Sequence, residues 1–387
     1  MHLQLSHELL LKAVDLVAKV ADKHHRFVIL GNIKFDLTPE TLTLTASDLE
    51  VELTTRTRLP EGACMEAGSI TLPAGKFHEI CKSLPNGVVE ILTLDDARCQ
   101  IKCGKSKFTL ATLPASDYPS IGTPAEQTYV GIARGELHDM ISHTRFCMAT
   151  QDVRHYLTGM LFHVEKNLLT CVATDGHRLA VSKRALSEDY TENQLIVPGK
   201  AVIELERLFG ELGKTLGKDE IVTLGVDNEF LQVELNFGKP DDNGRATDEL
   251  VVSLTARLIE GKFPDYRRVL PTGSDRTALF KKDAIMDVLR RVSILSNERS
   301  RGVIFDFGAE NVTIRSNNSD GGEAVESLAI NYEGEPIELS LNEAYLKAVF
   351  GVLSGDVRLQ MSHPNSPTLI TQIGDELRQY VVMPMRI

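Results

Sequence analysis

A threefold repeat of local patterns constrains this sequence more than any other feature. Three stretches with a helical spacing of apolar residues lie at 8–20, 135–148 and 281–295. A glycine that opens a strand-like run follows each of them, at Gly31, Gly159 and Gly302. The first two glycines lie about 130 positions apart, which is the length of a domain and too long for a solenoid repeat. The sequence therefore predicts three similar consecutive domains.

Each unit also contains a second helical stretch, which follows an alternating apolar strand ending near Pro73, Pro198 or Ser340. Other alternating runs, such as 42–46 and 51–54, predict half-buried strands. Strands outnumber helices, so we expect an α+β fold with two helices packed on antiparallel sheets in each domain. A polar insertion at 238–249 lengthens the second unit and predicts a solvent loop. The expected domains, joined by short linkers at 119–128 and 270–276, are 1–125, 126–270 and 271–387.

Length and composition indicate a soluble protein. The chain has 387 residues, and a hydrophobic fraction of 42% allows each domain to bury a core. The sequence has no apolar run of about 18 residues, and its first residues lack the pattern of a secretory signal. Its six cysteines are scattered without a C-x-x-C pair, which is typical of reduced thiols. We expect a cytoplasmic location.

The charge of the chain gives two opposing indications. A net charge of -12 argues against nucleic acid, because phosphate binding usually requires a basic domain. Binding follows the local potential, however, so helices with basic residues on one common face would give an acidic chain a basic lining. Otherwise these residues belong to ordinary solvated helix faces. The basic residues of the helical stretches are Lys12, Lys19, Lys23, Lys76, Lys82, Arg134, Arg145, Lys200, Arg207, Lys281, Lys282, Arg290, Arg291 and Lys347.

Two fragments, at 104–106 and 213–215, resemble the end of a phosphate-binding loop. Such a loop requires another glycine five positions before its glycine–lysine pair, so that backbone N–H groups can surround the phosphate. Cys99 and Leu208 occupy these positions. We therefore exclude a nucleotide-binding loop at both places.

Asp175 and His177 place an acid and a histidine in one short segment. A hydrolase would also require a nucleophile within hydrogen-bond reach of the histidine. The sequence contains no G-x-S-x-G motif and no second cluster with metal-ligand spacing. Asp-Gly at 175–176 is also a common turn dipeptide. We favour the turn, keep a hydrolase based on Asp175 and His177 as the alternative function, and expect no cofactor or metal.

Two segments that end repeats, 113–119 and 261–271, both pair Asp-Tyr with prolines. They predict domain-closing turns that dock an aromatic ring, and the second also offers Pro264 and Arg268 to a surface site. The last eight residues are unusually apolar for a chain end, which predicts a closing strand at 380–382. Met383 and Met385 suit a groove, because thioethers adapt to varied partners.

Taken together, these motifs closely resemble the bacterial sliding clamps, the β subunits of DNA polymerase III. The resemblance rests on TDGHRLAV at 174–181, GKFPDYRRVLP at 261–271, SNE at 296–298 and YVVMPMR at 380–386, in order and spacing along three repeats. It implies a head-to-tail homodimer whose six domains form a ring around duplex DNA. Such a clamp would tether the replicative polymerase, the clamp loader and other DNA-processing proteins through short peptides. It would bind DNA without regard to sequence, and it would give processivity without catalysis.

The resemblance implies a peptide groove between the second and third domains. Ser300 departs from the family, because related clamps often carry an aromatic residue at this edge of the groove. The implied groove residues are Leu157, Thr174, Gly176, His177, Arg178, Leu179, Pro264, Arg268, Val269, Asn342, Tyr345, Val382, Met383, Pro384, Met385 and Arg386.

The resemblance also implies DNA contacts and a dimer seam. His24 departs from the family, which often has an arginine there, so DNA contact at this loop could depend on pH. The implied DNA contacts are Lys23, His24, His25, Arg26, Gln151, Arg154, His155, Tyr156 and Lys200. The implied seam combines Phe108 and Leu110 of one chain with Ile294 and Leu295 of the other. Charged residues flank it, namely Lys76, Lys105, Lys107, Glu323 and Glu326.

Overall fold

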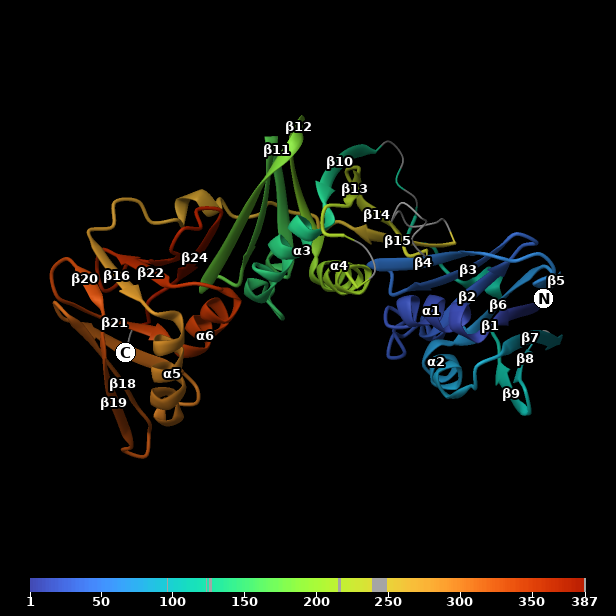
Figure 1. Cartoon of the computed structure of the whole chain (residues 1–387), viewed down its shortest axis with the longest axis horizontal. Helices are drawn as coiled ribbons and strands as arrows, with labels where there is room; N and C mark the ends of the chain where they lie inside the picture. The colour runs from blue at the N-terminus through green and yellow to red at the C-terminus, as the bar shows by residue number, and fades with distance from the viewer. Residues whose placement is uncertain (96, 123, 125–126, 215–216, 239–248, 386–387) are drawn as a thin grey trace. The chain divides into compact units, whose positions relative to one another are not determined.

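The computed structural model of the chain describes residues 1–95, 97–122, 124, 127–214, 217–238 and 249–385 (Figure 1). Its chain forms two units, each with its own internal packing. The first unit comprises Met1–His138 and Lys200–Leu258, and the second comprises Asp139–Gly199 and Ile259–Ile387. Most of the polar insertion, at 239–248, lies outside the described residues.

An eight-stranded antiparallel sheet forms the larger sheet of the first unit, in the order β10-β13-β14-β15-β4-β3-β2-β6. β4 pairs with β15, with Leu53 opposite Leu254, so the sheet combines strands from the first two expected domains. Alternate residues of β3 and β4 are buried, as expected for strands with one face on the core. The strands are β2 (Asn32–Leu37), β3 (Thr41–Ser47), β4 (Val51–Arg58), β6 (Gly68–Pro73), β10 (Thr128–Ala133), β13 (Ile221–Val226), β14 (Phe230–Asn236) and β15 (Leu250–Arg257).

A five-stranded sheet and several helices belong to the rest of the first unit. Helix α1 (His7–Val17) buries Leu10, Val14 and Val17 and packs on β3, β4 and β7 as well as on α2 (Ala74–Ser83). Helix α4 (Gly199–Leu212) begins at the division between the units. The strands, in the order β5-β1-β7-β8-β9, are β1 (His2–Ser6), β5 (Cys64–Glu66), β7 (Val88–Asp95), β8 (Arg98–Cys103) and β9 (Ser106–Ala111).

A seven-stranded antiparallel sheet forms the larger sheet of the second unit, in the order β11-β12-β24-β23-β22-β16-β20. β12 pairs with β24, and Leu179 lies opposite Val381. Strands from the second and third expected domains therefore share one sheet. The strands are β11 (Gly159–Thr174), β12 (Arg178–Pro198), β16 (Arg276–Phe280), β20 (Asn331–Glu333), β22 (Val357–Met361), β23 (Thr368–Gln372) and β24 (Arg378–Val382).

A four-stranded sheet and further helices belong to the rest of the second unit. Helix α5 (Lys282–Val292) packs on β18, β19 and α6 (Glu343–Val352). The core beneath these helices contains Ile285, Leu346 and Tyr380, which are all fully buried. The strands, in the order β19-β18-β17-β21, are β17 (Gly302–Phe307), β18 (Asn311–Asn317), β19 (Glu323–Ala329) and β21 (Ile337–Asn342).

The predicted first helices of the three repeats are present, but each ends earlier than expected. The stretch predicted at 135–148 forms α3 (Arg134–Ser142) and then the separate 3₁₀ turn Arg145–Cys147. The Thr144 hydroxyl donates to the Met140 carbonyl at 2.7 Å and so satisfies an acceptor at the helix end. Likewise, α1 ends at Val17 and α5 at Val292, short of the predicted ends at 20 and 295.

Both Asp-Tyr segments dock their rings, as predicted. The Tyr118 hydroxyl accepts from the Ser47 backbone N–H at 3.0 Å and donates to the Asn32 carbonyl at 3.3 Å. Burial of this ring raises the pKa of Tyr118. Tyr266 lies in the 3₁₀ turn Tyr266–Arg268 and is 7% exposed. The fragment at 104–106 lies in the β8–β9 hairpin turn, where Gly104 has a positive φ.

Within the part of the chain that the structure describes, no helix is long and apolar enough to cross a membrane.

Candidate functional site

An apolar hollow of about 250 Å³ lies in the second unit, where the β11–β12 hairpin turn meets the end of β24. Leu157, Leu179 and Val381 are buried at its base, and Phe263 lies among the buried residues packed with them. The residues that line the hollow are Arg154, Leu157, Thr174, Gly176, Arg178, Leu179, Phe263, Pro264, Tyr266, Val269, Val381 and Met383. We call this hollow the groove.

The turn that borders the groove is held by Asp175. Its carboxylate accepts from the backbone N–H groups of His177 and Arg178 and pairs with the Arg178 guanidinium at 3.0 Å. Gly176 has φ +88, a conformation that favours glycine. Asp175 therefore shapes the turn, and its hydrogen bonds do not orient the His177 ring, which stacks on Tyr345. This arrangement lacks the acid–histidine pair that the hydrolase alternative requires.

A cationic and aromatic cluster stands at the edge of the groove. The guanidinium of Arg178 lies over the rings of Phe146 and Tyr345. The His177 ring also stacks on Tyr345. Asn342 caps α6, because its side chain accepts from the backbone N–H groups of Ala344 and Tyr345. These contacts fix the Tyr345 ring at the start of the helix.

The alternation of β24 decides which C-terminal residues reach the groove. Val381 and Met383 line it, whereas Val382 points to the opposite side and is fully buried in the core beneath α6. Backbone hydrogen bonds continue past the strand, from Met383 N–H to the His177 carbonyl at 2.9 Å and from Met385 N–H to the Ser340 carbonyl at 2.8 Å. Met383 and Met385 therefore remain half-buried at the surface.

Eight of the predicted groove residues line the hollow, and most of the others among the described residues lie around it. Tyr345, His177 and Asn342 belong to the cluster at its edge, while Arg268 is exposed and pairs with Asp265 at 3.0 Å. Ser300 is exposed, and its carbonyl accepts from the Asn342 side chain at 3.2 Å. Pro384 and Met385 are half-buried after the strand, and Arg386 lies outside the described residues.

Sequence reasoning missed three lining residues, Phe263, Tyr266 and Val381. The two aromatic residues belong to the segment 261–271, which we interpreted chiefly as a closing turn. Arg154, predicted to contact DNA, also lines the groove, and its guanidinium lies against Gly176. Residues two positions apart in a strand face the same side, so the prediction of Met383 as a groove residue could also have indicated Val381.

The predicted DNA-contact residues lie on surface loops of both units and on α4. In the first unit, Lys23, His24 and Arg26 are exposed, and the Arg26 guanidinium lies 5.0 Å from the centre of the Phe27 ring. His25 stacks on the same ring. Lys200 pairs with Asp48 at 2.8 Å and with Glu50 at 3.5 Å, so its charge is compensated within the chain.

In the second unit, the predicted DNA-contact residues surround the 3₁₀ turn His155–Leu157. Gln151, Arg154 and His155 are exposed, and Tyr156 packs at the margin of the groove core. Hydrogen bonds from the Arg154 guanidinium and backbone lower the pKa of the Asp152 carboxyl to about 2. Arg154 is thus held by a carboxylate that remains charged near neutral pH.

The predicted apolar seam residues lie on the edge strand β9 in the first unit and in the 3₁₀ turn Ser293–Leu295, which contacts the edge strand β19, in the second. β9 pairs only with β8, and β19 pairs only with β18, within the described part of the chain. Phe108 and Leu110 are half-buried on β9, while Ile294 is 78% exposed and the neighbouring Leu295 is half-buried. An unpaired edge can bind a strand from another chain.

The charged seam residues are also at the surface, and two of them have partners in the same chain. Lys76 pairs with Glu79 at 3.2 Å. Glu326 pairs with Arg291 at 2.5 Å, and this guanidinium lowers the pKa of the Glu326 carboxyl. The other predicted charges are exposed, namely Lys105, Lys107 and Glu323.

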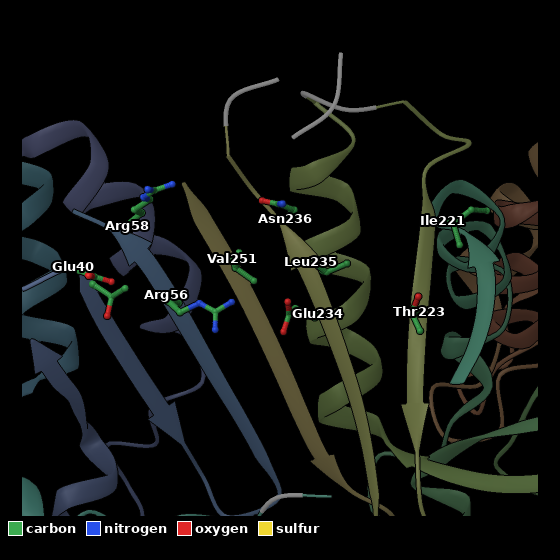
Figure 2. A pocket seen from close by; sticks show the side chains of 10 residues that line it. Glu40, Arg56, Arg58, Ile221, Thr223, Glu234, Leu235, Asn236 and Val251 are labelled. Carbon is green, nitrogen blue, oxygen red and sulfur yellow. The ribbon is translucent and has the colours of Figure 1, made fainter. Parts of the chain in front are cut away.

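A second hollow, of about 660 Å³, lies on the exposed face of the eight-stranded sheet (Figure 2). Arg56 and Arg58 project from β4, and Glu234 and Asn236 lie on β14 across Val251. This hollow is larger than the groove, but exposed charged groups border it. Its lining is more polar than apolar, whereas the groove combines mostly apolar walls with a few fixed polar groups.

Comparison with known proteins identifies relatives along the whole chain. Three family models match it in order: the N-terminal domain of the DNA polymerase III beta subunit at 1–122, the central domain at 131–265 and the C-terminal domain at 267–386. The beta sliding clamp of Pseudomonas putida is 39% identical, and the match covers 100% of both chains. That of Escherichia coli K12 is 35% identical, with 98% of each chain covered.

Solved structures give the same result. The DNA polymerase III subunit beta of Pseudomonas aeruginosa superposes with a TM-score of 0.89 at 36% identity, and 100% of each chain is covered. A structure of the P. aeruginosa sliding clamp bound to griselimycin has a TM-score of 0.89 at 37% identity, again over 100% of both chains.

Proposed function

Because this chain belongs to the family of DNA polymerase III β subunits, the β sliding clamps, we propose that it encircles duplex DNA and tethers the replicative polymerase to it. The chain is a DNA sliding clamp, a processivity subunit that does no catalysis of its own. The observation that carries the proposal is the match of three consecutive clamp domains over the whole chain. The domain ranges that we propose are 1–125, 126–270 and 271–387.

Two sheet edges support a ring made of two chains. The β9 edge and the β19 edge are different surfaces, so joining one to the other is a head-to-tail contact. Such a contact closes into a ring when the rotation at each seam completes the circle. Phe108 and Leu110 would meet Ile294 and Leu295 of the partner subunit, with the lysines of one side near Glu323. Apolar contacts would supply most of the affinity, and the surrounding charges would set the orientation.

A ring retains DNA by topology and requires no tight contact with it. The exposed cations at 23–26 and 151–156, with Lys200, would make weak contacts with phosphates that allow sliding. Basic side chains on the helices would line the hole, while the net charge of -12 would lie mainly elsewhere. Each tethered polymerase would then have a high effective concentration at the primer end.

The groove is our proposed binding site for short peptides of the polymerase, the clamp loader and other DNA-processing proteins. Leu179, Val381 and Met383 offer apolar contact, and the adaptable thioether suits peptides of varied sequence. The cluster of Arg178 and Tyr345 offers polar and aromatic contact at the edge. Griselimycin, which binds the P. aeruginosa clamp, is the probe that we expect to occupy this groove.

We also propose that the protein acts in the cytoplasm. Its six cysteines are free thiols, and five of them are buried. Unpaired thiols are typical of a reducing compartment.

Primer extension on a singly primed DNA circle tests the function. The cognate polymerase and clamp loader are supplied with and without this protein, and the lengths of the products from single binding events are measured. We expect much longer products with the protein present. Equal lengths would contradict a processivity function.

A further inference from the structure

A buried histidine supports one wall of the groove from behind. His163 lies on β11 and is 2% exposed. Its Nδ1 lies 3.3 Å from the Tyr266 hydroxyl, and its Nε2 lies 3.2 Å from a carboxylate oxygen of Glu192 on β12. The two rings meet edge to face with centres 6.3 Å apart. Tyr266 lines the groove, so this histidine contacts a groove residue without lining the groove itself.

The two partners determine which ring nitrogen carries the proton. An ionised carboxylate can only accept a hydrogen bond, so Nε2 of His163 must be the N–H that donates to Glu192. In the neutral ring, Nδ1 is then an acceptor, and the Tyr266 hydroxyl donates to it. Both polar atoms of the buried histidine and the tyrosine hydroxyl are therefore satisfied in one arrangement.

The remaining surroundings of Tyr266 hold its ring from another direction. The Arg267 guanidinium lies 5.8 Å from the centre of the Tyr266 ring and pairs with Glu165 of β11 at 2.6 Å. Glu165 and His163 stand two positions apart on β11, so one strand supplies both supports. The wall of the groove is thus attached to the β11–β12 hairpin by Glu165, His163 and Glu192.

The geometry points to His163 as a positioning residue, which sets the Tyr266 ring for the peptide that the groove binds. This inference rests on the proposed peptide-binding function of the groove. It adds that His163, which does not line the groove, affects peptide binding through Tyr266. Loss of His163 leaves the buried Tyr266 hydroxyl without its acceptor, and an unsatisfied buried hydroxyl displaces the ring toward other partners. Peptide affinity then falls although every side chain that contacts the peptide is unchanged.

Protonation of His163 should have a related effect. The imidazolium donates from both nitrogens, so Nδ1 no longer accepts from Tyr266, while the contact with Glu192 becomes an ion pair. The charged groups that face this network from the packed elements are Glu192, Glu165 and Arg267. We therefore expect weaker binding whenever the ring carries this second proton.

The test measures griselimycin binding to the full-length protein by calorimetry between pH 5.5 and 8. His163→Leu removes both polar contacts and should weaken binding about fivefold at pH 7.5. His163→Gln is the matched control, because its amide can donate to Glu192 and accept from Tyr266 without titrating. It should bind within about twofold of the original protein, and its affinity should depend less on pH.

A double-substitution cycle keeps the test valid if His163→Leu also lowers stability. In a Tyr266→Phe background the hydroxyl is absent, so adding His163→Leu should cause little further loss. Equal losses in both backgrounds, or identical pH profiles for His163→Gln and the original protein, would overturn the inference. If the original protein does not bind griselimycin, or if Met383→Ala leaves binding unchanged, the result contradicts the proposed peptide-binding function of the groove and not the role of His163.

Discussion

The guanidinium carbon of Arg178 lies 4.7 Å from the centre of the Tyr345 ring. Arg178 opens β12, and Tyr345 lies in the first turns of α6, so this contact connects the hairpin turn to the helix within the second unit. Asp175 holds the same guanidinium at 3.0 Å, which fixes its direction. A cation held over an aromatic ring stabilises both groups and defines the edge of the groove.

Tyr345→Ala should therefore weaken binding of griselimycin about fivefold, because Arg178 loses the ring beneath it. Tyr345→Phe retains the ring and should bind within about twofold of the original protein. Calorimetry at pH 7.5 measures both. Equal weakening by the two substitutions would show that the hydroxyl, and not the ring, carries the effect.

Met383→Ala combined with Met385→Ala should weaken griselimycin binding about tenfold, because two adaptable apolar side chains leave the site. Both residues follow the last strand, so the core and the melting temperature should change little. Met65→Ala is the control, since Met65 is 55% exposed in the first unit. A double variant with full affinity and normal folding would contradict the assignment of the groove.

The local parts of this fold were predictable from the sequence, and its long-range pairings were not. The apolar chain end correctly predicted the closing strand at 380–382, and the Asp-Tyr pairs correctly predicted the docking of Tyr118 and Tyr266. The pairing of Leu53 with Leu254 joins residues about 200 positions apart, and no local pattern encodes its register. The shared sheets were therefore missed.

In the candidate site, too, some residues were predictable from the sequence, whereas contacts that depend on packing were not. The resemblance supplied most residues of the groove, but it also included Val382, which strand alternation turns into the core. Support from behind, as His163 gives to Tyr266, depends on how β11 packs on the turn at 266–268. A buried histidine on an apolar strand carries no signal in the sequence that names its partner.

Ile294→Ala with Leu295→Ala should convert the dimer into monomers. Ile294 is 78% exposed in the single chain, so its truncation should change the stability of the single chain little. The same truncation should greatly weaken the affinity of an apolar seam between two chains. Sedimentation at micromolar concentration measures the mass of each variant. Ile203→Ala, at a residue that is 49% exposed on α4, should remain a dimer. An unchanged mass for the double variant would count against this seam.

Asp139→Asn should lower the free energy of unfolding by about 2 kcal/mol. Asp139 pairs with Arg184 at 2.5 Å and also with Arg378, so one carboxylate compensates two largely buried guanidinium groups. Removal of one partner from a fully buried pair costs roughly 3–5 kcal/mol, and partial exposure of Asp139 reduces this. Urea unfolding measures the difference. Asp287→Asn, in an exposed pair with Arg290, should change stability by less than about 0.5 kcal/mol.

Thiol labelling at pH 8 should distinguish Cys64 from four of the buried cysteines. Burial raises the pKa of Cys81 and Cys99 to about 12, and it raises the pKa of Cys147 and Cys171 as well. Because the thiolate is the reactive form, these four should remain protonated and unlabelled until the protein unfolds. Cys64 is half-exposed and should react first. Mass spectrometry of iodoacetamide-treated protein locates the labels, and rapid modification of Cys147 would contradict the packing described.

The most direct test of encirclement compares retention on circular and linear DNA. The clamp loader places the protein on a nicked circular plasmid, and gel filtration separates bound from free protein before and after a single cut by a restriction enzyme. A ring held by topology should remain on the circle and leave the linear molecule from its ends. Retention on the linear plasmid would mean that direct contacts hold the protein, and it would contradict the sliding ring.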